Sequence, residues 1–478
     1  MRFRKLKMLS CIILCFAVLS GIVLSDINPI NNPAYAVAED SEDGIYQRIN
    51  EYLADACKKA YFPAMSVTIV DKDNVLFSEV YGNCKDTDVP FLLGSVSKSF
   101  TAVCIMQLVE KGKIDLNAPL SRYLPDATDG DRISILQLLN HTSGLSEHQN
   151  LGNYKIVGEQ GVHEYSNVNY SLLGKVIEAV DGLKYEDYVT QNVFEPLSMT
   201  NSSATYEGSK SNGLIETYEN WFGINTKTTP KYPESENDWI TTSAGYLSSS
   251  TADLGKYLQM YLSRGKGVIS NDSINKMFYE NVAVQAEIPY KYGMGWTLIE
   301  EPLTEPALRH AGLVETGMAT IYILPNSGIG IAAAVNTNDY FVGKDLMDRI
   351  DWSIAMMIMG MEPNQIKENE YVLRHLLYDF AYFVVLLISV LPLCLISVFK
   401  KRISKGRFSV RIILLTLLHL ILPILILLLP LMFFATPLWV VEAFVPDMFM
   451  TIIVSSCMLF IGGIVKTVLI IMNKKKSV

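Results

Sequence analysis

The sequence predicts an α+β domain at residues 39–361, followed by three membrane-spanning α-helices. Near the start of this segment, an amphipathic helical pattern precedes two β-rich runs joined by a turn signal, Asp71-Lys72-Asp73-Asn74. Strand signals return only near its end, so strands from both ends can complete one antiparallel sheet, with helical patterns between them. Beyond residue 379 the composition changes to three long apolar runs, each of which can cross a bilayer.

The first 38 residues have the pattern of an export signal. Basic residues occupy the start, an apolar run from 8 to 24 follows, and the small-residue sequences Ala34-Tyr35-Ala36 and Ala36-Val37-Ala38 offer cleavage sites. We therefore predict a signal peptide at 1–38, with an uncleaved membrane anchor as the alternative. Both place the following domain outside the cytoplasm.

Periodicity and turn signals predict the order of the elements in the domain. Apolar residues at spacings of four predict a helix at 43–60, which Pro63 ends. A second helix carries Ser95 and Lys98 and ends near Gly112. The polar, aromatic stretch 207–237 is expected to be a loop beside a cleft. The other expected elements are strands at 64–70, 75–81, 295–299, 318–324 and 329–335, and helices at 133–139, 169–179, 185–193, 252–262 and 346–359.

The apolar runs follow a linker at 362–379 and are predicted to be transmembrane helices at 380–399, 412–434 and 448–471. Lys400, Lys401 and Arg402 lie between the first two runs, and three lysines follow the third. Because positively charged loops stay on the cytoplasmic side, both clusters and the C-terminus are expected in the cytoplasm. The domain and the loop 439–447 then face the outside, and the chain is expected to be a multi-pass protein of the cell membrane.

Composition and charge argue against several function classes. The formal net charge of −9 and the lack of a basic stripe argue against nucleic acid as a partner. The seven cysteines show no zinc spacing, and too few fall in the domain for a disulfide framework. No cluster of His, Asp and Glu residues at ligand spacing accompanies His141 or His163. We therefore expect neither a metal nor a cofactor.

The organising motif of the domain is Ser95-x-x-Lys98, which opens the second predicted helix. Gly94 supplies a tight turn, and Ser95 is expected at the N-cap or in the first turn, where Lys98 shares its helix face. An amine beside a serine hydroxyl can make that hydroxyl a nucleophile, and the helix dipole can stabilise the developing oxyanion. Taken alone, the motif also fits a plain N-cap with a solvated lysine, so its meaning depends on the rest of the chain.

Two later stretches favour the catalytic interpretation of Ser95-x-x-Lys98 over the plain N-cap: Tyr165-Ser166-Asn167, and His310-Ala311-Gly312 in the last strands. In this order, after an N-terminal hairpin and Ser-x-x-Lys, they resemble the serine β-lactamase and penicillin-binding-protein superfamily. The pattern is similar to the branch with class C β-lactamases, D-Ala-D-Ala carboxypeptidases, D-aminopeptidases and esterases. The resemblance covers about residues 43–361 and implies a β-lactamase/transpeptidase-like fold, an antiparallel sheet flanked by helices with an all-helical subdomain. Looser matches are Gly112-Lys113-Ile114-Asp115-Leu116, Asn140-His141-Thr142-Ser143-Gly144, Ser243-Ala244-Gly245 and Tyr292-Gly293-Met294-Gly295-Trp296.

The resemblance implies a role for each catalytic residue. Ser95 would be the nucleophile that forms an acyl-enzyme, and Lys98 would hold or accept its proton. Tyr165 would be the partner base and the proton relay to the leaving group, the part that histidine plays in a Ser-His-Asp triad. The alternative for Tyr165 is a buried tyrosine whose hydroxyl is satisfied by a structural hydrogen bond.

The resemblance also implies a set of substrate-binding residues. Asn167 would hydrogen-bond the side-chain amide of the substrate and help to fix Lys98. The backbone N–H groups of Ser95 and Leu313 would form the oxyanion hole. Gly312 would let the substrate backbone approach the edge of the strand closely.

The third motif departs from the superfamily pattern of Lys-Thr-Gly or Lys-Ser-Gly. In the superfamily pattern an ammonium and a hydroxyl at these positions bind the substrate carboxylate. Here they are replaced by His310, which is mostly neutral at external pH, and by Ala311, which has no hydroxyl. Losing one charge-assisted hydrogen bond weakens binding by about tenfold to a hundredfold. The departure disfavours efficient β-lactam hydrolysis and favours a carboxypeptidase, aminopeptidase or esterase. Glu315 leaves alternatives open: it could charge His310, bind a substrate amine, or be a solvated surface carboxylate.

These observations predict a membrane-anchored extracytoplasmic serine hydrolase that works through an acyl-enzyme on Ser95. Its substrate is expected to be a D-amino-acid peptide, an ester or a β-lactam of the cell envelope, so a small molecule or a peptide. The alternative is a penicillin-recognising sensor or a non-catalytic envelope-binding protein built on the same domain. The membrane helices would anchor the domain or dock a membrane protein partner.

Overall fold

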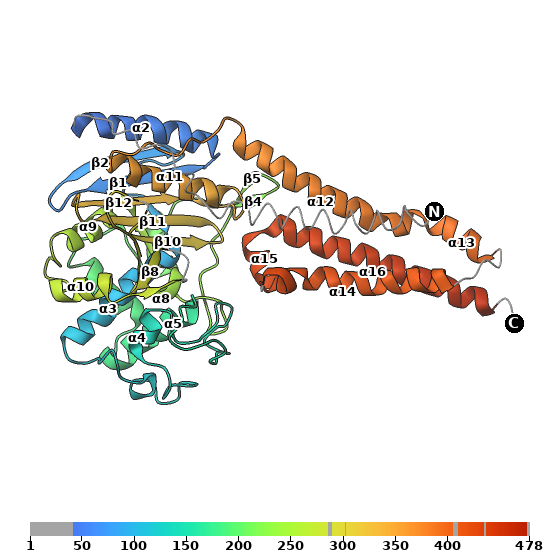
Figure 1. Cartoon of the computed structure of the whole chain (residues 1–478), viewed down its shortest axis with the longest axis horizontal. Coiled ribbons are helices and arrows are strands. Elements are labelled where there is room, and N and C mark those ends of the chain that lie inside the picture. Colours follow the sequence, from blue (N-terminus) through green and yellow to red (C-terminus); the bar gives the residue numbers. More distant parts are fainter. Residues whose placement is uncertain (1–41, 285–288, 302, 405–409, 435, 476–478) are drawn as a thin grey trace.

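An eight-stranded antiparallel sheet forms the centre of the domain in this computed structural model, which describes residues 42–284, 289–301, 303–404, 410–434 and 436–475 (Figure 1). The predicted signal peptide at 1–38 lies outside these residues. The strand order is β2-β1-β12-β11-β10-β9-β8-β7. The bounds are β1 (Ala64–Val70), β2 (Val75–Gly82), β7 (Val282–Ala283), β8 (Tyr290–Gly293), β9 (Trp296–Ile299), β10 (Ala307–Val314), β11 (Gly317–Leu324) and β12 (Ile329–Val335).

The N-terminal hairpin pairs directly with strands from the end of the domain. Met65 of β1 lies opposite Val335 of β12, and the antiparallel register continues to Val70 opposite Gly330. This pairing confirms the prediction that both ends of the domain complete one antiparallel sheet. Every residue of β1, β11 and β12 is buried, because helices cover both faces of the sheet.

Two hydrophobic cores lie on the two faces of the sheet. Helices α2 (Glu42–Lys59) and α11 (Gly343–Ile358) cover one face, where Leu53 and Ile350 pack in the core with the sheet. Helix α9 (Thr251–Leu262) covers the other face (Figure 1). There the core is continuous with the helical subdomain, so the sheet and the subdomain form one packed unit.

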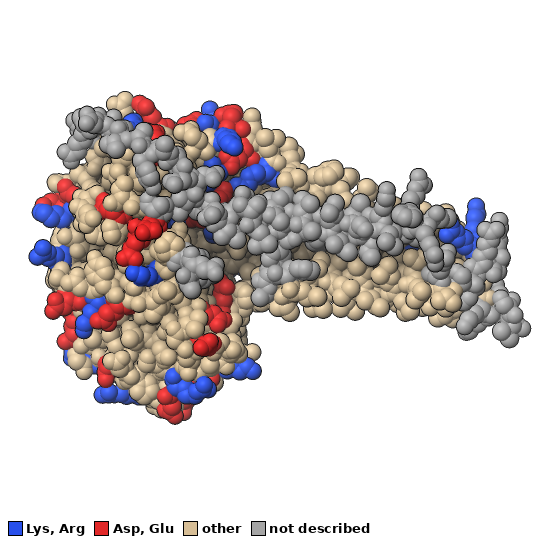
Figure 2. All heavy atoms as spheres, in the orientation of Figure 1, with Lys and Arg blue, Asp and Glu red and all other residues tan. Residues whose placement is uncertain are grey.

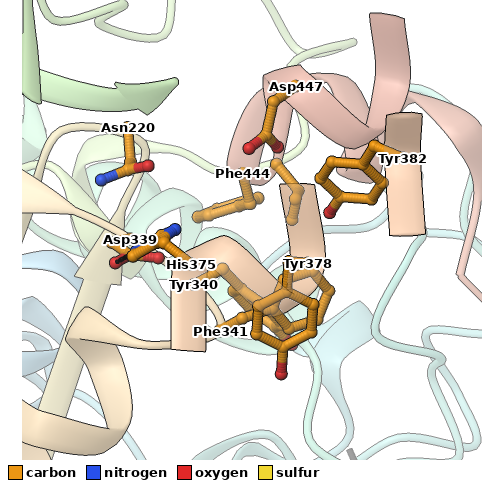
Figure 3. A pocket seen from close by; sticks show the side chains of 10 residues that line it. Asn220, Asp339, Tyr340, Phe341, His375, Tyr378, Tyr382, Phe444 and Asp447 are labelled. Carbon is orange, nitrogen blue, oxygen red and sulfur yellow. Dashed lines mark hydrogen bonds and ion pairs between the residues drawn. The ribbon is translucent and has the colours of Figure 1, made fainter. Parts of the chain in front are cut away.

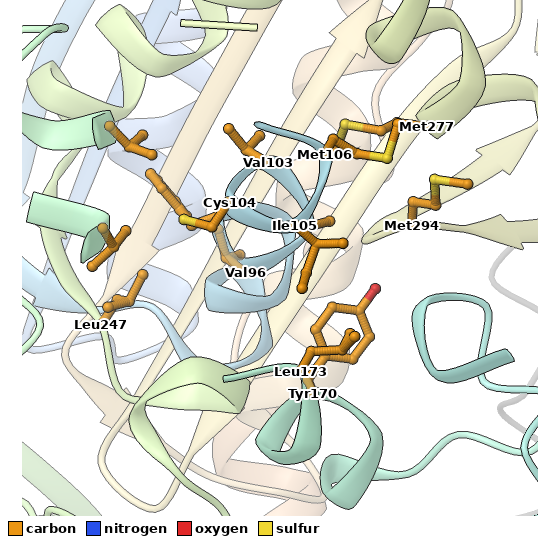
Figure 4. Packing of buried hydrophobic residues seen from close by; sticks show 14 of the residues in the cluster. Val96, Val103, Cys104, Ile105, Met106, Tyr170, Leu173, Leu247, Met277 and Met294 are labelled. Atoms are coloured by element: carbon orange, nitrogen blue, oxygen red, sulfur yellow. The ribbon is translucent and has the colours of Figure 1, made fainter. Parts of the chain in front are cut away.

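The all-helical subdomain is built around α3 (Ser97–Glu110). Twelve residues of α3, from Ser97 to Leu108, are buried, and side chains of the surrounding elements pack around the helix (Figure 4). A helix that is buried on all sides is held in place by its neighbours rather than by one apolar stripe. The other elements are α4 (Ile135–Leu139), α5 (Asn167–Asp181), α6 (Tyr185–Val189), α7 (Tyr206–Ser211), α8 (Thr242–Gly245), α10 (Asn271–Tyr279) and the short turns η1 (Gly94–Val96), η2 (Leu120–Arg122) and η3 (Thr190–Phe194).

The stretch 207–237 is not the loop that its polar composition predicted. It contains a hairpin of β4 (Thr217–Trp221) and β5 (Ile224–Thr228), and β4 pairs in parallel with the short β13 (Thr337–Asn338). Phe222 and Gly223 connect the two strands with φ angles of 53° and 73°. Two residues with positive φ make a type I′ turn, whose twist matches a hairpin. The turn geometry therefore stabilises strands that the polar composition did not indicate.

Three helices after the domain are long and apolar enough to cross a membrane, at 370–404, 412–432 and 446–473. They agree with the three predicted apolar runs. Two details differ from the prediction. Helix α12 begins inside the expected linker, where its first-turn residue Glu370 forms an ion pair with Arg349 of α11 at 2.6 Å. The expected loop 439–447 contains a helix. The elements are α12 (Glu370–Cys394), α13 (Ile396–Ser404), α14 (Val410–Phe434), α15 (Leu438–Phe444) and α16 (Pro446–Lys475).

These helices form a rod that leaves one side of the domain (Figure 1). Charged side chains gather over the domain, whereas the described atoms visible along most of the rod are tan (Figure 2). Lys400, Lys401 and Arg402 lie on α13, at the tip away from the domain. A rod with an apolar length and a basic tip is typical of a membrane-spanning bundle.

A buried ion pair ties β10 to α11. Arg309 Nη2 lies 3.0 Å from Asp351 Oδ2 and 2.6 Å from Asp348 Oδ1. The Asp351 side chain is 0% exposed, and the hydroxyl of Tyr322 donates to it at 2.8 Å. The carboxylate of Asp351 therefore depends on Arg309 for its compensating charge.

Replacing Arg309 with Met should destabilise the domain, because the buried Asp351 would lose its cation. Removing one partner of a buried pair costs about 3–5 kcal/mol, which for a domain of this size lowers Tm by about 10 °C. Thermal unfolding of the full chain in detergent measures the change. Lys344→Met is the control, because the partly exposed Lys344–Asp348 pair should contribute about 1 kcal/mol or less. Equal losses of Tm in the two variants would contradict the analysis.

Candidate active site

Ser95 lies in a tight turn between a buried strand and a buried helix. Strand β3 (Pro90–Leu92) pairs with β6 (Ser248–Ser250) and leads into η1, which continues as α3. Gly94 has a φ of 54°, a backbone conformation that favours glycine. The N-cap residue of α3 is Val96, so the N-cap alternative for Ser95 is wrong. Its hydroxyl is left to interact with other side chains.

Lys98 is completely buried beside Ser95. Its Nζ lies 3.0 Å from Ser95 Oγ, 2.7 Å from Asn167 Oδ1 and 2.6 Å from the carbonyl oxygen of Ala244. Three acceptors match the three donors of an ammonium group. The alternative of a solvated lysine is therefore wrong.

Burial also changes the proton affinity of Lys98. Removal from water disfavours the ammonium form and lowers the pKa of Lys98 well below its usual value, with the negative charge of Glu147 acting in the opposite direction. When Lys98 is neutral, its two N–H groups can donate to Asn167 and Ala244. Its lone pair then faces Ser95 Oγ, which is the arrangement of a base beside its nucleophile.

Tyr165 approaches Ser95 from the segment that precedes α5. Its hydroxyl donates to Ser95 Oγ at 2.6 Å, and Lys98 Nζ lies 4.9 Å from the centre of its ring. Burial raises the pKa of Tyr165, so the phenol keeps its proton at neutral pH. Of the two roles that the resemblance implies, this environment favours the proton relay over the base.

The edge of β10 closes the site on the side of the sheet. Strand β9 pairs with β10 only as far as Arg309, and beyond that residue β10 packs on η1. A Cβ built on Gly312 would lie 2.7 Å from Ser95 N and 2.9 Å from Gly94 C, and one built on Gly94 would overlap Leu313 N. Both glycines are therefore required for this close approach. It brings the backbone nitrogens of Ser95 and Leu313 near one another, as an oxyanion hole with two donors requires.

His310 is buried and does not line the cleft. Its Nδ1 donates to the carbonyl oxygen of Gly295 at 2.5 Å, and burial lowers the pKa of His310 to about 3. It is therefore neutral at physiological pH, as expected, and the alternative that Glu315 charges it is wrong. The surface-carboxylate alternative is wrong as well, because Glu315 is buried and accepts hydrogen bonds from Trp239 Nε1 and Tyr246 OH.

The predicted catalytic residues open onto a cleft of about 990 Å³. Ser95, Tyr165, Asn167, Gly312 and Leu313 all line it, and Lys98 lies directly beneath Ser95. The structure thus brings together six of the seven predicted site residues at one place. Within the described parts of the chain, no group of three or more His, Cys, Asp or Glu side chains could hold a metal ion.

Sequence reasoning missed three parts of this site. The Ala244 carbonyl that binds Lys98 is a backbone group, which any residue type can supply. No residue of 207–237 lines the cleft, although that stretch was expected beside it, whereas Trp239 does. The third part is a wall formed by α14, α15 and α16. Trp439, an aromatic residue between two apolar runs, was the available signal, but nothing in the sequence indicates which surface of the domain it meets.

Comparison with known proteins identifies the family. The family model described as Beta-lactamase matches residues 48–355, more than half of the chain. The chain belongs to the beta-lactamase family. Protein flp of Staphylococcus aureus is 26% identical to it over 343 residues, which cover 65% of this chain and 66% of that protein. The chain thus spans just under two thirds of that relative.

Solved structures confirm the β-lactamase-like fold. The octameric penicillin-binding protein homologue from Pyrococcus abyssi is similar with a TM-score of 0.59 and 24% identity, covering 69% of this chain and 80% of that one. A class C beta-lactamase is similar with a TM-score of 0.56 and 18% identity, covering 67% of this chain and 99% of that one. Both likenesses agree with the resemblance drawn from the sequence motifs.

The reaction of Ser95 with a fluorophosphonate should become faster as the pH rises, because only neutral Lys98 can accept the serine proton. We expect the rate to increase by about tenfold per pH unit below the pKa of Lys98 and to level off well below pH 10.5. Time courses of covalent labelling at several pH values measure it. An inflection at or above 10.5, or the same profile in Lys98→Ala, would contradict this role of Lys98.

Proposed function

We propose that this chain is a membrane-anchored serine hydrolase that cleaves its substrate through an acyl-enzyme on Ser95. The observation that carries the proposal is one hydrogen-bonded unit, in which Lys98 Nζ and Tyr165 OH lie 3.0 Å and 2.6 Å from Ser95 Oγ. Burying an amine costs stability. A purely structural role for Lys98 leaves this cost unexplained, whereas catalysis requires the lowered pKa.

The geometry supports a balanced acylation step. Neutral Lys98 takes the hydroxyl proton of Ser95 while Oγ bonds to the carbonyl carbon of the substrate. The N–H groups of Ser95 and Leu313 stabilise the oxyanion. The bond to the leaving amine or alcohol then breaks, Tyr165 gives that group a proton, and the Lys98 ammonium returns a proton to Tyr165.

Deacylation uses Lys98 and Ser95 again, with a water molecule as the nucleophile. A water molecule attacks the carbonyl carbon of the acyl-enzyme and gives up a proton to Lys98, and the bond to Ser95 Oγ breaks. The proton passes back to Oγ, the acid product leaves, and Lys98 is neutral again. No group other than Ser95, Lys98, Tyr165 and the oxyanion donors is needed.

The third motif supports a substrate without strong carboxylate recognition. His310 is neutral and buried, and Ala311 has no hydroxyl, so neither supplies the ammonium or hydroxyl contact of the Lys-Thr-Gly pattern. We therefore propose a D-amino-acid peptide or ester of the cell envelope as the substrate, with carboxypeptidase, aminopeptidase or esterase chemistry. A β-lactam would acylate Ser95 less efficiently.

The charge distribution supports an extracytoplasmic domain. Lys400, Lys401 and Arg402 lie at the tip of the rod away from the domain. Because basic segments remain in the cytoplasm, we place this tip and the C-terminus inside and the catalytic domain on the outer face of the membrane. This topology brings the cleft to the compartment that holds cell-envelope substrates.

Replacing Ser95 with Ala should abolish hydrolysis by the full chain in detergent. We expect a D-alanyl ester and a D-aminoacyl anilide to be cleaved faster than a chromogenic β-lactam, and the activity of Ser95→Ala to fall by at least about a thousandfold. Ser99→Ala is the matched control, because Ser99 is a buried serine of α3, the helix that also carries Lys98, and its hydroxyl donates to the Val96 carbonyl. A covalent adduct without turnover would favour the sensor alternative, and no adduct from a folded chain would refute the nucleophile.

A further inference from the structure

The catalytic cleft continues beyond the domain into the membrane helices. One end contains Ser95, Tyr165 and Asn167, and the other end lies between α14, α15 and α16. Its volume of about 990 Å³ is at the upper limit of the range for small-molecule sites. We call the second end the apolar arm; its side chains include Leu422, Leu425, Ile426, Leu429, Val440 and Ile452.

The apolar arm extends along a segment that is long and apolar enough to cross the membrane. Its lining residues on α14 run from Leu422 to Pro430, which corresponds to about 12 Å of helix. The hydrocarbon core of a bilayer is about 30 Å thick, so the arm covers a substantial part of the leaflet nearest the domain. Leu425 lines the cleft and is 43% exposed, so the described chain leaves part of this apolar wall uncovered.

Aromatic contacts hold α15 against the mouth of the catalytic cleft. The rings of Trp439 and Phe444 on α15 lie 6.0 Å and 5.3 Å from the ring of Trp239 in the domain. Trp239 is fixed in turn, because its Nε1 donates to Glu315 at 3.0 Å. The apolar arm is therefore bounded by packed side chains of both parts of the chain.

A second group of contacts joins the membrane helices to the domain (Figure 3). Asp447 at the start of α16 accepts the backbone N–H of Phe222 at 3.1 Å. His375 of α12 lies 2.8 Å from Asp339 of the domain. The space enclosed here is only about 10 Å³, so the helices pack closely on the domain and hold the walls of the apolar arm in place.

We propose that the substrate is a membrane-embedded amphiphile, an ester or amide whose reacting carbonyl lies at Ser95 and whose hydrocarbon chain lies in the apolar arm. This inference rests on the proposed function. Glu147, His148, Lys344 and Asp348 line the cleft as well, and they supply polar surroundings for the headgroup. Each methylene group that moves from water into the arm strengthens binding by about fourfold.

The arrangement favours this occupant over a soluble peptide. A water-soluble substrate would leave the apolar walls of the arm without a partner, whereas exposed apolar surface usually marks a site that binds an apolar partner. The hydrocarbon chain of a lipid would instead cover these walls with apolar surface. The catalytic serine and the lipid chain then meet in one continuous cleft.

The test compares two fluorophosphonates, with an ethyl and a dodecyl chain, on the full chain in lipid nanodiscs. Leu429→Trp fills the arm, and Leu428→Trp is the matched control, because Leu428 is 41% exposed and does not line the cleft. We expect the dodecyl-to-ethyl ratio of labelling rates to fall by about tenfold in Leu429→Trp, equivalent to about two displaced methylene groups. Leu428→Trp should keep the wild-type ratio. Because the dodecyl probe partitions into the bilayer equally for all variants, partitioning does not affect the comparison of their dodecyl-to-ethyl ratios.

The outcomes separate this inference from the proposed function. Labelling of Ser95 by both probes, with the same ratio in wild type and Leu429→Trp, would overturn the lipid substrate and leave the hydrolase intact. No labelling of the folded chain by either probe would overturn the proposed function itself. If Leu429→Trp does not fold, Val440→Trp replaces it in the test, because Val440 lines the cleft from α15.

Discussion

The buried amine of Lys98 is the constraint on which the active site depends. Its three acceptors come from η1, α5 and α8, so all three must be held around one atom. Burial on all sides of α3 fixes the helix that carries this amine, and the sheet presents Gly312 to the other side of Ser95. The two layers of the domain therefore meet at Lys98, and the burial that lowers its pKa favours the neutral amine that the proposed mechanism requires.

Local patterns were sufficient to predict the framework of the fold. The periodicity of α2, the turn after β1 and the apolar runs of the membrane helices each depend on short-range chemistry, which a sequence displays directly. The Ser95-x-x-Lys98 spacing likewise brings two side chains together across the turn where η1 continues into α3. Asn167 and Gly312, far apart in the chain, were placed only through the resemblance to a known superfamily.

The errors came from features that tertiary packing decides. The hairpin at Phe222 and Gly223 depends on backbone angles that a polar composition does not indicate. The solvation of Glu315 depends on Trp239 and Tyr246, which approach it from another segment. His310 is neutral, as its ordinary pKa indicated, but the sequence did not reveal that its ring is buried away from the cleft. In each case the residue type was visible, but its surroundings were not.

The C-terminal helices line the cleft that contains Ser95 and are long and apolar enough to anchor the chain in a membrane. With the substrate that we propose, the position of the bilayer would influence substrate choice. The contacts of Trp439 with Trp239 and of Asp447 with Phe222 couple the two parts mechanically. If the substrate is the membrane-embedded amphiphile that we propose, its specificity arises from surfaces beyond the family match, which ends at residue 355.

The most direct test of the central claim is peptide mapping of the full chain by mass spectrometry after reaction with a fluorophosphonate. The account predicts one adduct on the peptide that contains Ser95, formed much more slowly in Lys98→Met and absent from Ser95→Ala. An adduct on another residue, or equal rates in wild type and Lys98→Met, would contradict the claim that a buried neutral lysine activates Ser95.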